Sequence, residues 1–229
     1  MTLTPGSGSP TDATTRRPRS GRIRRFSRVE RAVHHVTGLL MIILLVTAAC
    51  LYVPQVATLV GRRDLVKPIH VYAGLALPFP ILFGWLAASF RADVRRLNRF
   101  GSADREWLKR EDRREVVDGE GVVRIGKFNA GQKLNAAFVF GSILVMLGTG
   151  LMLTFPDPWP DDWRAGATFV HDWLTLAVFV GFLGHLWYAL RDRGALQGMI
   201  TGEVTEEWAA AHHSGWYQEV NGQVPHSDT

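Results

Sequence analysis

Apolar residues are concentrated in four blocks along the chain, and charged residues fill the segments between them. A helix that spans a bilayer needs about 20 consecutive, mostly apolar residues. Each block reaches that length, at residues 33–53, 69–90, 134–155 and 167–190. One such block could be a buried helix of a soluble protein, but four make that interpretation improbable. The pattern predicts an all-α membrane protein built as a four-transmembrane-helix bundle.

The polar segments divide the rest of the chain. Residues 1–23 are rich in Pro, Gly, Ser and Thr and have little to bury, so we expect them to be disordered. Residues 24–220 then form the membrane domain, with a charged loop at 91–133, a polar tail at 191–220 and a frayed C-terminus at 221–229. The strings "SADREWLKRED" in the loop and "TEEWAAAHH" in the tail predict short helices.

Lysine and arginine predict the orientation, because positive residues are retained on the cytoplasmic side of a membrane. Eight precede the first block, twelve lie in the loop 91–133 and two follow the fourth block, whereas the two other loops hold four. Both termini are therefore expected in the cytoplasm. The isoelectric point near 9.8 follows from these anchors and does not indicate nucleic-acid binding.

The chain has a single cysteine, Cys50, inside the first block. One cysteine can neither form an internal disulfide nor hold an iron–sulfur cluster by itself. Any such cluster must belong to another subunit.

Histidines are the unusual residues of the apolar blocks. Five of the eight in the chain fall in the predicted spans, where ionisable side chains are rare and usually functional. His171 and His185 are 14 residues apart, which places them about 21 Å apart along one helix. The rotation between them is about 40° short of four full turns, so both rings lie on nearly the same face.

The predicted topology matches these histidines in depth. His70 and His171 lie near the outer face, and His34 or His35 lies near the inner face with His185. Two facing pairs suit two bis-imidazole haems, because haem iron accepts one axial ligand on each face of the ring. Zinc would need four close ligands, and the absence of a C-x-x-C-H motif indicates non-covalent b-type haem. His34 and His35 are about 100° apart on a helix, so geometry does not choose between them.

Several motifs then resemble one family. The strings "RAVHH", "KPIHVYAG", "KFNAGQK", "FVHDW", "GHLWY" and "GMITGEVTEEWAAAHHSGWY" are similar to those of the γ subunit of membrane-bound respiratory formate dehydrogenase, a di-haem cytochrome b. The resemblance covers about residues 24–220. It implies a bundle in the inner membrane of a bacterium, with two b-type haems and menaquinone reduction at the cytoplasmic side. It also implies two partners: an iron–sulfur subunit and a catalytic molybdenum or tungsten formate dehydrogenase subunit.

The resemblance also implies a set of haem ligands. His34 matches the ligand in the family's R-A-x-H context, and His35 stands where the family has an aromatic residue. His70 and His171 match the ligands of the outer haem. His185 matches the second ligand of the cytoplasmic-side haem, which pairs it with His34.

A quinone site follows from the same resemblance. Asn129 matches the family's quinone-site asparagine, and Gly131 and Gln132 would line the same pocket. An asparagine amide can donate a hydrogen bond to a quinone carbonyl, although asparagine also commonly begins a helix. His212 and His213 would lie near this site or its proton supply, or they would be a solvated pair on a surface helix.

The sequence therefore predicts the electron-transferring, quinone-reducing subunit of a formate dehydrogenase-like complex, with formate oxidised on another subunit. One alternative is the cytochrome b subunit of a hydrogenase or another molybdoenzyme. Another is a haem-free membrane anchor or transporter. Pro78 and Pro80 interrupt the second block, as in discontinuous transporter helices, but no internal repeat accompanies them.

Overall fold

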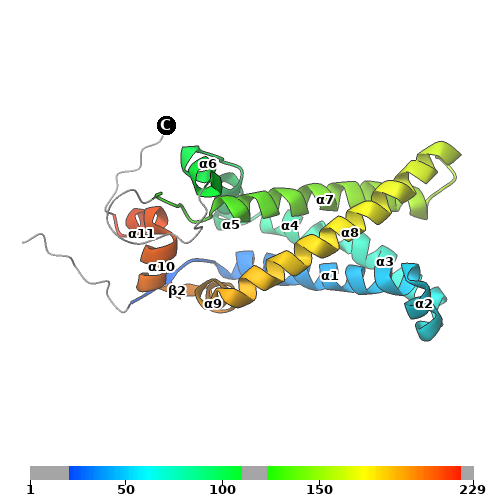
Figure 1. Ribbon diagram of the computed structural model, residues 1–229, viewed down its shortest axis with the longest axis horizontal. Coiled ribbons are helices and arrows are strands. Elements are labelled where there is room, and N and C mark those ends of the chain that lie inside the picture. The colour runs from blue at the N-terminus through cyan, green and yellow to red at the C-terminus, as the bar shows by residue number, and fades with distance from the viewer. Residues whose placement is uncertain (1–20, 110–122, 223–229) are drawn as a thin grey trace, which may run out of the picture.

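Four long helices form an elongated bundle in the computed structural model, which describes residues 21–109 and 123–222 (Figure 1). The helices long and apolar enough to cross a membrane are Arg28–Tyr52, Arg63–Gly84, Ala130–Thr154 and Asp161–Arg191. Helix α1 (Arg28–Tyr52) packs along the second of these, and α7 (Ala130–Thr154) packs along α8 (Asp161–Arg191). The expectation of four helices long and apolar enough to span a membrane is confirmed.

The second span is broken in the middle. It consists of α3 (Arg63–Ala76) and α4 (Phe79–Gly84), and the break falls at Pro78, whose ring nitrogen cannot donate a helical hydrogen bond. The predicted interruption is confirmed, but the predicted range is displaced. The span ends at Gly84, because Ala87 adopts an extended backbone before α5 (Ala88–Leu97).

The other spanning helices extend beyond their apolar blocks. Helix α8 begins six residues before the predicted span, and α1 begins five residues before its own. The apolar pattern marks only the part of a helix that lies in hydrocarbon, whereas the backbone hydrogen bonds continue into the charged flanks. At α1 the helix begins where Ser27 and Glu30 form a capping box.

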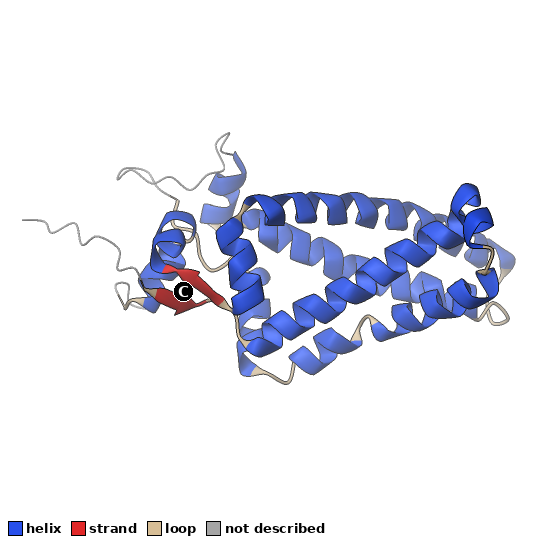
Figure 2. Ribbon diagram, turned by 90° about the horizontal axis from the view of Figure 1, so that it is seen from below, coloured by secondary structure: helices blue, strands red, loops and turns tan. Residues whose placement is uncertain are grey.

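One end of the bundle carries a small folded cap (Figure 2). We define the cap as residues 21–27, 88–109, 123–129 and 193–222. Besides α5, the cap contains β1 (Arg22–Arg24), α6 (Ser102–Lys109), α9 (Arg193–Thr201), β2 (Glu203–Thr205), α10 (Glu206–His212) and α11 (Ser214–Val220). Helix α2 (Pro54–Val60) and the link between α7 and α8 lie at the opposite end (Figure 1). The short helices predicted in the loop and tail correspond to α6 and α10.

The two strands join the start of the described chain to its C-terminal part. They pair antiparallel, with Arg22 opposite Thr205 and Arg24 opposite Glu203. Val204 packs in a buried cluster with Ala209 and Trp216. The prediction that disorder extends to residue 23 is therefore wrong for the last residues of that segment, because β2 supplies backbone partners for them.

The bundle presents large apolar side chains to its surroundings. No more than 17 % of any of the four apolar spans is buried, and Leu39 and Trp187 are 59 % and 57 % exposed. A water-soluble protein rarely exposes an apolar surface of this extent. The helices therefore suit a lipid environment, which excludes the interpretation as buried helices of a soluble protein.

Candidate functional site

Four of the five histidines in the spans form two facing pairs, one toward each end of the bundle. The ring centres of His34 and His185 are 6.0 Å apart, and those of His70 and His171 are 6.3 Å apart. The ring planes meet at 52° and 64°. Among the described residues, no hydrogen bond joins the two rings of either pair. The rings of each pair therefore face one another without binding one another.

His35 takes a different direction from His34. Its Nε2 lies 3.3 Å from the carbonyl oxygen of Met199 in α9, and its ring is nearly perpendicular to that of His34. The structure thus brings His34, and not His35, to His185. This is the choice that spacing along the helix alone left open.

The separation within each pair suits one metal ion between two imidazoles. Two ring nitrogens that bind one ion from opposite sides, at roughly 2 Å each, lie about 4 Å apart. The distance from each ligand nitrogen to the centre of its own ring accounts for the rest of the 6.0 and 6.3 Å between ring centres. Within the described ranges, no three His, Cys, Asp or Glu residues converge as a metal cluster. Each pair therefore has the spacing of two ligands on opposite sides of one ion, with no third protein ligand beside them in the described ranges.

Two threonines fix the tautomer of the His70–His171 pair. The Oγ1 of Thr47 lies 2.8 Å from His70 Nδ1, and the Oγ1 of Thr149 lies 2.9 Å from His171 Nδ1. Each hydroxyl donates its single proton to a carbonyl one turn back in its own helix, Ile43 for Thr47 at 2.7 Å and the equivalent carbonyl for Thr149 at 2.8 Å. Because that proton is already engaged, each oxygen accepts a hydrogen bond from the imidazole Nδ1–H. Both Nε2 atoms keep a lone pair, the form that binds a metal.

Sequence reasoning missed both threonines. Each lies inside an apolar block, 23 residues before His70 in one case and 22 residues before His171 in the other. The available signal was a hydroxyl in a hydrocarbon-length helix that precedes a histidine-bearing helix. Threonine also bonds commonly to its own helix in membranes, so that signal did not specify a partner.

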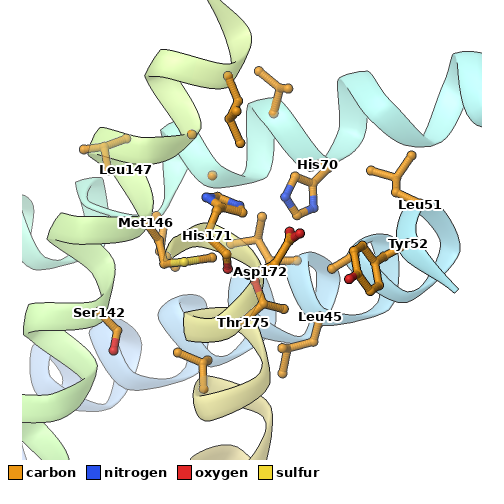
Figure 3. Close-up of a pocket in the computed structure, with 18 of the residues that line it drawn as sticks. Leu45, Leu51, Tyr52, His70, Ser142, Met146, Leu147, His171, Asp172 and Thr175 are labelled. Atoms are coloured by element: carbon orange, nitrogen blue, oxygen red, sulfur yellow. Dashed lines mark hydrogen bonds between the residues drawn. The ribbon is translucent and has the colours of Figure 1, made fainter. Parts of the chain in front are cut away.

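A large apolar cavity surrounds the His70–His171 pair (Figure 3). Its volume is about 920 Å³, and its wall comes from α1, α3, α7 and α8. Small-molecule and cofactor sites typically occupy about 300–1,000 Å³, so this volume lies at the upper end of that range. Figure 3 shows His70 and His171 among leucine and methionine side chains. The residues present fit a b-type haem: two neutral imidazoles for the iron and an apolar wall for the macrocycle.

The His34–His185 pair has a different environment. Among the described residues, neither ring has a hydrogen-bond partner, in contrast to the threonine-bound rings of the other pair. Hydrogen bonds from a ligand's second nitrogen tune the basicity of the ligand. The two pairs are therefore alike in spacing but unequal as donors to a metal.

Asn129 begins α7 and forms a capping box with Gln132. Its Oδ1 accepts from the backbone N–H of Gln132 at 2.9 Å, and its own N–H donates to Gln132 Oε1 at 3.0 Å. A methyl group on Gly131 would lie 3.1 Å from the Trp107 ring, so this turn packs closely against α6. Capping occupies only the carbonyl oxygen of the Asn129 side chain. Its Nδ2 has no hydrogen-bond partner among the described residues and can donate to a ligand.

An ion pair holds α5 beside the segment that leads into α7. Lys127 Nζ donates to Asp93 Oδ2 at 2.5 Å, and both side chains are about nine-tenths buried. Burial raises the pKa of Asp93, and the neighbouring Lys127 opposes that rise. The pair fixes the position of the chain two residues before Asn129.

His213 lies at the centre of the cap and is almost fully buried. Its Nδ1 is 2.8 Å from the Gly126 carbonyl, to which it donates, and its Nε2 lies 2.9 Å from Arg25 Nη2, from which it accepts. The Arg25 guanidinium also lies 4.6 Å from the Trp208 ring centre. His212 is exposed and stacks on that ring at 5.1 Å. These contacts give His213 a structural role in the cap, and a role of the pair in proton supply stays a prediction.

Acidification should loosen the cap at His213. Burial lowers the pKa of His213 well below 6.5, and the charge of Arg25 lowers it further. The hydrogen bond from His213 to the Gly126 carbonyl acts in the opposite direction. The folded state therefore binds fewer protons than the unfolded state, and the stabilisation is lost as pH falls below about 6.5, by up to about 1.4 kcal/mol per pH unit.

Hydrogen exchange of residues 206–220, corrected for intrinsic rates, should speed up at pH 5 relative to pH 7.5. His213→Gln should abolish this pH dependence and His212→Gln should keep it; equal pH dependence in wild type and His213→Gln would contradict the assignment.

Comparison with known proteins gives a consistent picture. The model of a family described as prokaryotic cytochrome b561 matches residues 25–202. The chain is 25 % identical over 200 residues to the cytochrome b556(Fdn) subunit of nitrate-inducible formate dehydrogenase from Escherichia coli (strain K12), covering 84 % of this chain and 88 % of that protein. It is 28 % identical over 204 residues to the cytochrome b556(fdo) subunit of the same organism, covering 86 % and 92 %. It is 26 % identical over 206 residues to the formate dehydrogenase cytochrome b556 subunit of Haemophilus influenzae, covering 86 % and 83 %.

Proposed function

Because the chain belongs to the prokaryotic cytochrome b561 family, we propose that it is the membrane cytochrome b subunit of a formate dehydrogenase complex. It carries electrons across the membrane through two b-type haems to a quinone. The name of each relative above includes formate dehydrogenase, which supports the choice of complex. The alternative donors are a hydrogenase or another molybdoenzyme.

One observation carries the proposal: two depth-separated histidine pairs with the spacing of axial ligand pairs. His70 and His171 hold the first haem, and His34 and His185 hold the second. When bound, b-type haem supplies reversible one-electron chemistry at its iron. Thr47 and Thr149 keep the ligand nitrogens of the first pair unprotonated, and the apolar cavity wall excludes water from it. A haem-free anchor or transporter has no need of these tautomer-fixing contacts.

The direction of transfer follows from the orientation. The cap carries most of the lysine and arginine that flank the spans, so we place it in the cytoplasm. The His70–His171 site then lies toward the outer face, where an iron–sulfur subunit delivers electrons. The chain's one cysteine cannot hold a cluster, so this partner and the catalytic subunit are separate chains. Inward movement of negative charge builds a membrane potential.

Quinone reduction is placed at the start of α7, beside the cap. The Nδ2 of Asn129 donates to a quinone carbonyl while the carbonyl oxygen of its side chain caps the helix. Gly131 lets the Trp107 ring pack closely against that turn, and Gln132 keeps the turn in place. Menaquinone is the expected substrate by resemblance. The protons consumed come from the cytoplasm, which is the side of the membrane where we place the cap with His212 and His213.

Removing a threonine hydroxyl should shift the potential of one haem. In Thr47→Val, His70 loses its hydrogen-bond acceptor and becomes a weaker donor, which destabilises the ferric state. The midpoint potential of the His70–His171 haem should rise by about 59 mV, equivalent to a tenfold change for one electron, while the other haem stays unchanged. Thr154→Val is the matched control, because Thr154 lines the same cavity and its hydroxyl donates to the Gly150 carbonyl without contacting a histidine ring. Equal potentials in the two variants would remove the assigned role of Thr47.

The function is tested by reducing the haems through their natural donor. In membranes from a strain that contains the whole complex, formate should reduce both b haems, and a menaquinone analogue should reoxidise them. Reduction by hydrogen and not by formate would assign the chain to a hydrogenase instead. Purified protein without haem, after expression with haem supplied, would overturn the cytochrome assignment.

A further inference from the structure

The wall of the large cavity contains two positive side chains on the helix that carries His70. Arg63, Lys67, His70 and Gly74 all line the cavity. Their spacing of four, three and four residues places them on one face of α3. Lys67 lies about 4.5 Å and Arg63 about 10.5 Å from His70 along the helix axis, both toward the α2 end of the bundle. The positive groups therefore stand at the rim of the cavity and the imidazole stands deeper.

Neither positive group is neutralised by a carboxylate of the described chain. Arg63 Nη1 donates to the carbonyl of Leu51 at 2.9 Å, and no salt bridge involves Arg63 or Lys67 within residues 21–109 and 123–222. The nearby Asp64 pairs with Arg62 instead, at 3.7 Å. Asp172 is the one carboxylate among the described residues of the cavity wall, and no salt bridge joins it to either cation. Positive charges at the edge of a bilayer-buried cavity point to an anionic ligand group.

We propose that Arg63 and Lys67 bind the two propionate carboxylates of the haem held by His70 and His171. This inference rests on the proposed function. A b-type haem is apolar except at one edge, where its two propionates carry negative charge. Arginine can bind a carboxylate through two parallel N–H groups, and lysine binds it as a point charge. The histidines set where the iron lies, and the two cations set which way the ring is turned.

This arrangement directs the propionate edge toward the α2 end and the apolar edge toward the centre of the bundle. The opposite orientation would place two carboxylates among leucine and methionine side chains, where an unpaired charge is costly. Two positive charges beside the propionates also favour the reduced, less positive haem. Removing them should therefore lower its midpoint potential.

The test compares Arg63→Gln/Lys67→Gln with Arg62→Gln in the full chain. Arg62 is the matched control, because it neighbours Arg63 but does not line the cavity. Redox titration of each purified protein should show a more negative midpoint for the His70–His171 haem in the double variant and no shift in the control. A His185→Ala background should retain only the His70–His171 haem. In that background, transfer of this haem to a scavenging apoprotein should be roughly tenfold faster in the double variant, because tenfold corresponds to the free energy of one charge-assisted hydrogen bond.

Reconstitution with haem dimethyl ester separates a propionate contact from a general packing effect. The ester carries no carboxylate, so the double variant and the control should lose it at equal rates. An unchanged midpoint and an unchanged rate of haem loss would overturn the propionate assignment while leaving the cytochrome function intact. A difference between variants that persists with the ester would also overturn it. Wild-type protein without haem at this site would overturn both this inference and the proposed function.

Discussion

Replacing His171 by alanine should leave a folded protein that binds one haem per polypeptide in place of two. His171 faces His70 at 6.3 Å between ring centres, and the cavity offers the iron no third imidazole within the described chain. We expect the remaining imidazole to hold the haem too weakly to survive purification, because the apolar wall supplies packing but nothing that replaces the lost bond to iron. Helix α8 keeps its packing against α7, so the other pair keeps its geometry.

Haem content and redox titration together check this expectation. A pyridine haemochrome assay on purified His171→Ala should give half the haem of the wild type, and titration should lose one of two one-electron components. His70→Ala should lose the same component, and His185→Ala should lose the other. Two haems retained in His171→Ala would mean that the facing rings are a packing arrangement without a ligand role.

The second large effect concerns two adjacent histidines with opposite expected outcomes. His34→Ala should remove the haem nearest the cap and lower formate-driven quinone reduction by more than about 100-fold, because the electron path then ends at the remaining haem. His35→Ala should keep both haems and most of the activity. Its ring contacts the Met199 carbonyl in α9 and does not face His185.

The measurement is quinol formation in membranes that contain the whole complex, with reduction of the remaining haem followed optically. In His34→Ala that haem should still be reduced by formate, which separates a broken path from a lost donor. The reverse outcome, with His35→Ala inactive and His34→Ala active, would transfer the ligand role to His35. Loss of activity in both variants with both haems retained would contradict the proposed path.

The sequence was a good guide to what depends on hydrocarbon length and a poor guide to what depends on packing. Apolar blocks predicted all four spanning helices, and Pro78 predicted the break in the second. The pairing of His70 with His171 followed from depth alone, since helix rise and membrane topology fix the depth of each ring. None of this required knowledge of how the helices are rotated.

The remainder depended on contacts between distant segments. Thr47 and Thr149 were not found, because a hydroxyl acquires a ligand-fixing role only when another helix brings an imidazole against it. The strands β1 and β2 have three residues each, too few for a period-two pattern, and they lie more than 170 residues apart. Helix spacing left the choice between His34 and His35 open and only the family resemblance indicated His34, whereas in the structure α8 brings His185 to His34 and α9 contacts His35.

The strand pair between β1 and β2 has a consequence for the order in which the protein is made. A ribosome releases residues 22–24 long before residues 203–205, yet each segment supplies the backbone partners of the other. The residues of the His70–His171 pair are all synthesised once α8 has begun, whereas the pair nearest the cap needs the end of α8, and the cap needs the residues that follow it. During biogenesis, the His70–His171 pair can therefore come together while the end of the bundle nearest the cap is still incomplete. Closure of the strand pair then marks the completed subunit.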